Sequence, residues 1–273
     1  MNFADSKRDN LTKKIVVRAF EANHGNANDL ALQIFNNGNF INDKIVIVTN
    51  EKHIKIRDIS KSQTEAYVYF SIYNPKESVS ISPNAVGVDD LVDVENYDNV
   101  HVFLKVKNDK MIAIFQISTN WPENKLMLIF EKFGIKITPS TVLDTKIVDA
   151  LRSEGFKSLH VNINVHASDF NKKPSFIDSL IKNEPRVGNQ LISGHLEITG
   201  KGNSTIASSI EQQPQKWIDD LDPDFYIETK KGRKITGDDI KLNRVYFTVP
   251  YGSKTIHSKY AIEIIDHFIL NAL

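Results

Sequence analysis

The segment Lys157–His166 alternates strictly between apolar and polar residues, and this pattern constrains the fold more than any other feature of the chain. The apolar positions are Leu159, Val161, Ile163 and Val165, and the polar positions are His160, Asn162, Asn164 and His166. Successive side chains of a β-strand point to opposite faces of its sheet. The segment is therefore predicted to be a strand with one apolar and one polar face.

Several other segments are also predicted to be strands. Lys13–Phe20 is β-branched and apolar, as expected of a buried strand. Three later segments are separated by short polar turns and predict an antiparallel meander: Ile45–Thr49, His53–Ile59 and Glu65–Tyr73. Val100–Val106 and Met111–Ser118 flank the turn Lys107–Lys110 and predict a hairpin.

Helices are predicted where apolar residues recur at helical spacing. The segments are Asn26–Asn37, a helix capped by Thr119 or Asn120 that ends at Gly134, and Ser258–Leu270. Asn74–Asn84 contains two prolines and several serines and is predicted to be a loop. Asp89–Tyr97 is predicted to be a short helix.

The order of these elements favours an α+β fold, with mostly antiparallel sheets, flanking helices and possibly two subdomains. A division near Thr138–Asp144 gives an N-terminal α+β region, 1–140, and a C-terminal α+β region, 141–273. Cysteine is absent, which excludes disulfides and cysteine-ligated zinc. The polar start MNFADSKRDNLTKK does not have the pattern of a signal peptide, and no run approaches the ~18 apolar residues of a membrane span. We expect a cytoplasmic protein without direct membrane insertion.

Charge is balanced over the whole chain but segregated locally. The 34 basic and 34 acidic residues cancel, so any nucleic-acid site must come from local clustering. The stretch Glu211–Glu228 is acidic, and Thr229–Lys259 is basic. The basic stretch predicts a DNA-contact surface formed by Lys230, Lys231, Arg233, Lys234, Lys241, Arg244 and Lys254. An ordinary solvated face is the alternative interpretation.

Recognisable enzyme motifs are lacking. The closest approach to a phosphate-binding loop, Gly194–Gly202, has one residue too many between its glycines. The shorter segment Gly200–Thr205 could hold one phosphate oxygen, or simply join a strand to a helix. His160 and His166 are six residues apart on one strand, roughly 20 Å, and cannot bind one metal ion together. We therefore expect no catalytic residues, no metal site and no cofactor.

One alternative is a metal-dependent nuclease. Asp224, Glu228 and Lys230 imitate the acidic residue and Glu-x-Lys pair of restriction-type nucleases. Two carboxylates four residues apart on one strand lie ~13 Å from each other, so one ion cannot bridge them directly. A second acid would have to come from elsewhere, for example Asp219 or Glu211.

The succession of elements resembles the RexA family of phage exclusion proteins. The resemblance lies in four segments: Lys13–Phe20, Val100–Ser118, Lys157–Phe170 and Asp222–Thr236. It implies an RdgC-like fold and a cytoplasmic homodimer that binds DNA with little sequence preference. It also implies a role in sensing phage DNA intermediates and signalling to a RexB-like membrane protein. Lys230 stands where the family carries a basic residue after a strand, whereas Lys231, Arg233 and Lys234 are inferred from local charge alone.

A third hypothesis is a protein–protein adaptor, in which the acidic run Asp219–Asp224 of one copy faces the basic turn of another.

Overall fold

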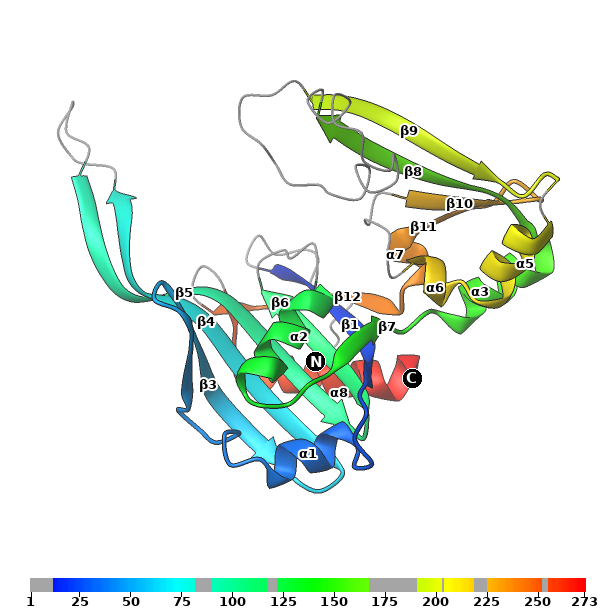
Figure 1. The fold of residues 1–273 in the computed structure, drawn as a ribbon. Helices are drawn as coiled ribbons and strands as arrows, with labels where there is room; N and C mark the ends of the chain where they lie inside the picture. Colours follow the sequence, from blue (N-terminus) through cyan, green and yellow to red (C-terminus); the bar gives the residue numbers. More distant parts are fainter. Residues whose placement is uncertain are drawn as a thin grey trace. The chain divides into compact units, whose positions relative to one another are not determined.

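The computed structural model describes residues 12–81, 90–116, 122–166, 191–202, 204–218, 225–251 and 255–273. The chain forms two compact units (Figure 1). Unit 1 comprises Met1–Val142 and Leu242–Leu273, and unit 2 comprises Leu143–Lys241. The strand pairings of both units are antiparallel, which confirms the predicted α+β fold with antiparallel sheets and flanking helices.

Unit 1 is built on an eight-stranded sheet. Seven strands follow the order β12-β1-β6-β5-β4-β3-β2, and β7 also pairs with β1. Their bounds are β1 Lys13–Asn23, β2 Ile45–Thr49, β3 Lys52–Lys61, β4 Glu65–Ile81, β5 Asp90–Lys107, β6 Lys110–Gln116, β7 Thr138–Thr141 and β12 Asn243–Thr248. A separate short pair consists of β13 Pro250–Tyr251 and β14 Thr255–Ile256. The meander and the hairpin predicted from the sequence are β2–β3–β4 and β5–β6.

Helices cover both faces of the unit 1 sheet. One core cluster joins β3–β6 to α1 (Leu30–Asn36) and α2 (Pro122–Lys132), with Ile34 and Phe130 fully buried. The other cluster joins the alternate positions of β1, β5 and β6 to α8 (Ser258–Ala272), with Phe268 fully buried. Helix α1 is shorter than predicted because Asp29, whose carboxylate accepts the Leu32 amide, caps it only at that point.

Two local predictions in unit 1 are wrong. The predicted loop Asn74–Asn84 continues as strand β4 as far as Ile81, and the predicted helix Asp89–Tyr97 lies in strand β5. Cross-strand pairing extends from Glu65↔Lys107 to Ile81↔Asp90, so the partner strand overrides the local turn and helix signals. Residues 82–84 and 89 of these two segments, and the proposed helix caps Thr119 and Asn120, lie outside the described residues.

Unit 2 is a four-stranded sheet with helices on one face. Its strand order is β11-β10-β8-β9. The bounds are α3 Thr145–Glu154, β8 Phe156–His166, β9 Leu191–Thr199, α5 Ser204–Gln212, α6 Gln215–Ile218, β10 Phe225–Thr229, β11 Lys234–Thr236 and α7 Gly237–Ile240. Leu159, Ile227 and Ile235 on the strands pack with Leu151 and Ile210 on the helices. The alternation of Lys157–His166 thus correctly predicted strand β8.

The units do not follow the linear division into 1–140 and 141–273. Leu242–Leu273 returns to unit 1 because β12 pairs with β1 and α8 packs on the unit 1 sheet. Unit 2 is therefore inserted into unit 1. The chain leaves and re-enters unit 1 at one point, where the Leu242 amide donates to the Val142 carbonyl at 2.7 Å.

Candidate nucleic-acid interface

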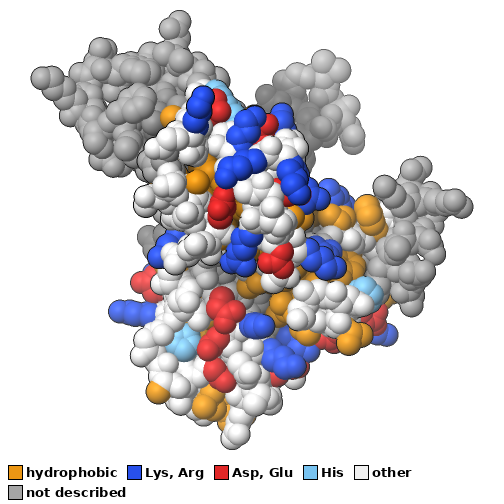
Figure 2. Space-filling view, turned by 90° about the vertical axis from the view of Figure 1, so that its right-hand side faces the viewer, with side chains coloured by type: hydrophobic (Ala, Val, Ile, Leu, Met, Phe, Trp, Pro, Cys, Tyr) orange, Lys and Arg blue, Asp and Glu red, His pale blue; other side chains and the backbone are white. Residues whose placement is uncertain are grey.

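A basic turn, Lys230–Lys234, connects β10 to β11 in unit 2. It is closed by hydrogen bonds from the Gly232 amide to the Thr229 carbonyl and from the Thr229 amide to the Arg233 carbonyl, both 2.9 Å long. Gly232 has φ +83°, a conformation that favours glycine at this corner. All five residues of the turn are exposed. Lys and Arg side chains gather over the face of unit 2 drawn in the upper part of Figure 2.

Arg233 is held at the base of the basic turn by Glu154, the last residue of α3. One carboxylate oxygen of Glu154 lies 3.4 Å from the Arg233 guanidinium, and the other accepts the Thr229 hydroxyl at 2.8 Å. The Glu154 side chain is only 17% exposed. Arg233 therefore contributes a fixed and partly neutralised charge.

Lys230 lies directly over Gly155. The Lys230 amide donates to the Gly155 carbonyl at 2.8 Å, and a Cβ on Gly155 would lie 3.0 Å from the Lys230 Cδ. Gly155 also has φ +78° as the residue that ends α3. Its lack of a side chain lets the Lys230 stem cross the end of α3 while the residue as a whole remains exposed.

Lys234 begins a stack of side chains that crosses the polar face of the unit 2 sheet. Its ammonium lies 4.9 Å from the centroid of the Tyr226 ring. Tyr226 stacks on His160 at 4.4 Å, and His160 stacks on His195 at 5.1 Å. We call Tyr226, His160 and His195 the aromatic column. Tyr226 covers one face of the His160 ring, whereas His195 meets the edge of that ring through the contact between His160 Nδ1 and His195 Nε2.

Ser158 and His160 have the separation of a nucleophile and its general base. The Ser158 hydroxyl lies 2.7 Å from His160 Nε2, and His160 Nδ1 lies 2.9 Å from His195 Nε2. However, Ser158 is only 1% exposed. A substrate cannot reach its hydroxyl in this conformation, so the arrangement serves to fix the aromatic column.

Glu228 pairs with Lys157 across β10 and β8. The Lys157 ammonium lies 2.8 Å from the Glu228 carboxylate. This hydrogen bond lowers the pKa of Glu228 and raises that of Lys157. Glu228 is the acid that the nuclease hypothesis requires, whereas Asp224 and Asp219 lie outside the described residues. Within the described ranges, no three His, Asp or Glu side chains are arranged to hold a metal ion.

The predicted DNA-contact residues are spread over both units. Lys230, Lys231, Arg233 and Lys234 come together in the basic turn. Lys241 is half-buried and forms an isolated antiparallel β-bridge with Leu143 in unit 2. Arg244 lies on β12 of unit 1, where its guanidinium donates to the Asn243 carbonyl at 2.7 Å. Lys254 lies outside the described residues.

Sequence reasoning missed Lys157 and the pairing of His160 with His195. It compared histidines along one strand only, whereas the contact crosses from β8 to β9. The strict alternation of Lys157–His166 identified the polar face, but nothing in the sequence identified its neighbour. The phosphate-binding segment proposed at Gly200–Thr205 follows the end of β9 at Thr199 and includes the start of α5 at Ser204, with residue 203 outside the described part.

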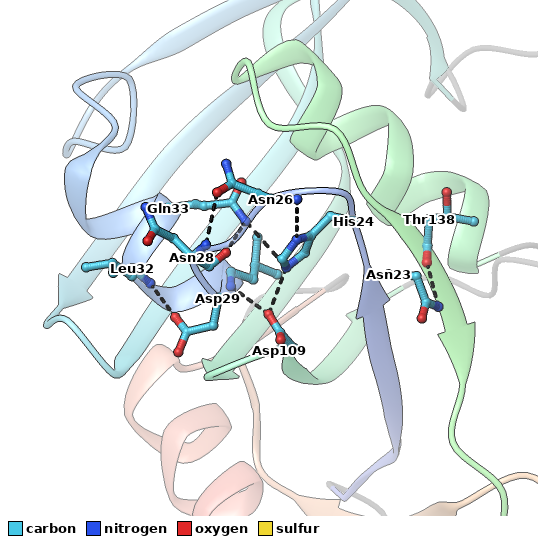
Figure 3. Close-up of polar contacts among 10 residues, drawn as sticks. Asn23, His24, Asn26, Asn28, Asp29, Leu32, Gln33, Asp109 and Thr138 are labelled. Carbon is cyan, nitrogen blue, oxygen red and sulfur yellow. Dashed lines mark hydrogen bonds and ion pairs between the residues drawn. The ribbon is translucent and has the colours of Figure 1, made fainter.

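A second polar cluster lies in unit 1, around His24 (Figure 3). His24 Nδ1 accepts the Asn26 amide at 3.3 Å, so the neutral ring carries its proton on Nε2 and donates it to Asp109 at 2.8 Å. The same Asp109 oxygen accepts the Leu30 amide at 2.7 Å. A general base needs a free ring nitrogen, and here a backbone amide occupies it. The cluster therefore anchors the start of α1.

No protein-family model matches the chain, and no curated protein matches it significantly in sequence. The resemblance to the RexA family thus remains a prediction from the succession of segments. None of the helices in the described part of the chain is both long and apolar enough to cross a membrane.

Proposed function

We propose that the protein binds DNA without reading its sequence, and that the basic turn of unit 2 contacts the phosphate backbone. The observation that carries the proposal is the convergence of three lysines and an arginine on one exposed five-residue turn. Two carboxylates beside the turn already have partners: Glu154 binds Thr229 and Arg233, and Glu228 binds Lys157. The charges of Lys230 and Lys231 are thereby left to face solvent.

Binding is expected to be independent of DNA sequence because the basic turn presents only ammonium and guanidinium groups. Ammonium groups on a turn neutralise phosphates, which are the same for every sequence, and each contact releases counterions. Base stacking is worth about 1–3 kcal/mol per base in proteins that bind single strands, and the Tyr226 ring on this surface already packs against His160 and Lys234.

The wider role comes from the resemblance to the RexA family. It places the protein in the cytoplasm as a homodimer of a phage exclusion system. There it senses phage DNA intermediates and signals to a RexB-like membrane partner. In this proposal the chain is a non-enzymatic sensor, and DNA binding is its input.

The test removes two charges without shortening the side chains. We expect Lys230→Gln with Lys231→Gln to weaken binding equally on two unrelated duplexes. The slope of log affinity against log salt falls by about 1.8 if both lysines contact phosphates. The matched control is Lys132→Gln with Lys136→Gln, two exposed lysines of unit 1. Fluorescence anisotropy over a salt series measures both effects.

Three outcomes contradict the proposal. They are an affinity that differs between the two duplexes, an affinity that does not change with salt concentration, and equal affinities of the test and control double variants. Incubation of the same duplexes with magnesium or manganese addresses the nuclease alternative. Cutting that Glu228→Ala abolishes would replace the proposed non-enzymatic role with metal-dependent hydrolysis.

A further inference from the structure

A β-bulge in strand β8 turns the side chain of Lys157 onto the polar face of the unit 2 sheet. Two consecutive residues of β10 pair with Ser158 and Phe156, so β8 has one extra residue, Lys157, between these pairs. Strict alternation would point Lys157 to the same side as Leu159, which lies in the core of unit 2. Bulges redirect side chains in this way. The Lys157 side chain is consequently exposed, and its ammonium lies 2.8 Å from the Glu228 carboxylate.

Two lysines flank Glu228 on this polar face. Lys234 pairs with Glu228 across β11 and β10, and Lys157 binds Glu228 from β8 on the other side. The strands follow the order β11-β10-β8, and neighbouring strands lie about 4.8 Å apart. The backbones of the two lysines are therefore about 10 Å apart, with the glutamate between them. Two ammonium groups share one carboxylate, which leaves an excess of positive charge.

This row of charges continues the basic turn. Lys234 is the last residue of the turn, and the Lys230 amide donates to the carbonyl of Gly155, two residues before Lys157. At about 3.3 Å per residue, Lys157 lies about 7 Å along the chain from that contact. Each strand of a duplex carries one phosphate per about 3.4 Å of helix axis. A DNA backbone that contacts the basic turn thus passes Lys157 within a few phosphates.

Lys157 can bind a phosphate without leaving Glu228. An ammonium group has three N–H donors, and the carboxylate of Glu228 accepts one of them. The Lys157 side chain is 54% exposed, whereas that of Glu228 is 21% exposed, so the lysine is the more accessible partner. The carboxylate nevertheless neutralises part of the lysine charge and repels a phosphate that approaches it.

We propose that Lys157 is a further phosphate-contacting residue that acts together with Lys234, and that Glu228 limits the affinity of this surface for DNA. The inference rests on the proposed function, because it extends the same surface. The competing explanation is a purely structural ion pair, in which Lys157 and Glu228 only join β8 to β10. The two explanations differ in what happens to DNA binding when Glu228 loses its charge.

The experiment measures the affinity of the full chain for one duplex by fluorescence anisotropy over a salt series, with a chelator present to prevent metal-dependent cutting. We expect Glu228→Gln to strengthen binding at low salt by at least about twofold, because an exposed ion pair shifts an equilibrium by about two- to fivefold. Lys157→Gln added to this variant reverses the gain and lowers the salt slope by about 0.9, the value for one phosphate contact. Lys157→Arg in its place keeps the slope, because it retains the charge.

Two matched controls change the same charges on the helices of unit 2. Asp149→Asn alters an exposed acid of α3, and Lys216→Gln alters an exposed lysine of α6. Both leave the affinity and its salt slope unchanged. They separate a contact at Lys157 from a general effect of net charge.

The inference is overturned if Glu228→Gln binds no more tightly than the wild type, or if Asp149→Asn strengthens binding as much. It is also overturned if Lys157→Gln leaves the salt slope unchanged in a chain whose circular dichroism matches the wild type. If the double variant of the basic turn still weakens binding in these cases, the proposed function stands without this extension. A wild-type chain with no affinity for DNA overturns both.

Discussion

Gly155 shares its space with the Lys230 side chain, and this contact gives a prediction at the scale of single residues. Gly155→Ala places a Cβ 3.0 Å from Lys230 Cδ and also strains a backbone at φ +78°. Gly232→Ala at φ +83° carries a comparable backbone strain but meets nothing within 4 Å. We expect each to lower the free energy of unfolding by about 1–3 kcal/mol, as measured by urea denaturation.

Only Gly155→Ala should also displace Lys230 and weaken DNA binding. Anisotropy on the two purified variants separates the effect on stability from the effect on the basic turn. Equal affinities for DNA would show that the position of Lys230 over Gly155 is irrelevant to binding.

Lys105 gives a prediction for the dependence of stability on pH. Its ammonium lies 2.7 Å from Asp266 on α8 and 2.8 Å from Glu65 on β4, and the side chain is 13% exposed. Burial alone would lower the pKa of Lys105, but the hydrogen bonds with the two carboxylates outweigh burial and raise it. Because the pKa of Lys105 is higher in the folded state, protonated Lys105 stabilises the folded protein. This stabilisation is fully present below the ordinary pKa of 10.5 and is lost as the pH rises through the raised pKa.

Lys105→Met should therefore cost about 1–3 kcal/mol at neutral pH, because two carboxylates lose their partner. The difference in the free energy of unfolding between wild type and variant should disappear as the pH rises past the pKa of Lys105. Lys107→Met, an exposed lysine on the same strand, serves as the control. Urea denaturation over a pH series measures the free energy of unfolding of the wild type and of both variants. A difference between wild type and Lys105→Met that persists in strong alkali would argue against the ion pair as its source.

At the scale of elements, β4 and β5 continue beyond the sheet as a two-stranded ribbon (Figure 1). Pairing of β4 with β3 ends at Tyr73, and pairing of β5 with β6 begins at His101. From there, Asn74–Ile81 and Asp90–Tyr97 pair with each other and with no other strand in the described part of the chain. A hairpin without a third strand is marginally stable in water.

The ribbon should consequently open independently of the sheet. Amides of Asn74–Ile81 and Asp90–Tyr97 are expected to exchange with deuterium at least about tenfold faster than those of Ala66–Ile72 and Val102–Val106 in the same strands. Hydrogen exchange with mass spectrometry resolves these peptides. Uniform protection along β4 and β5 would mean that something covers the ribbon in solution.

The ribbon also marks where prediction from sequence failed. Strand β8 was predictable because its alternation is complete, and the meander because its turns are short and polar. Pro75, Ser78 and Ser80 have low strand propensity, and the acidic Asp89–Tyr97 resembles a helix locally. The two segments are strands because they pair with each other. The sequence pattern of one segment alone does not reveal this non-local effect. For the same reason, sequence patterns located the basic turn but not its contacts with Glu154 and Gly155.

At the scale of the whole molecule, the C-terminal segment returns to the N-terminal sheet. Strand β12 pairs with β1 over Lys13↔Thr248 to Arg18↔Asn243, a separation of more than two hundred residues that no local pattern reveals. Both ends of the insertion meet β1 at one residue: the Ala19 amide donates to the Leu242 carbonyl, and the Val142 amide donates to the Ala19 carbonyl. Unit 2 is thus attached to unit 1 through adjacent chain positions.

This connection predicts that unit 1 folds without unit 2. Residues 143–241 can be replaced by a short glycine linker, because Val142 and Leu242 are hydrogen-bonded neighbours and a tight turn can join them. We expect cooperative thermal unfolding from the remaining chain, since both of its core clusters stay complete. DNA binding should be lost, because the basic turn is removed.

The excised unit 2, residues 143–241, provides the complementary measurement. Its ends are also adjacent, bridged at Leu143↔Lys241, and its core cluster lies within the unit. We expect it to bind both duplexes with the salt dependence of the full chain, since all four basic residues of the turn are retained. If unit 1 alone keeps the affinity for DNA while folded unit 2 has none, the contact surface must be sought on unit 1, where Arg244 lies, and the basic turn is not the site.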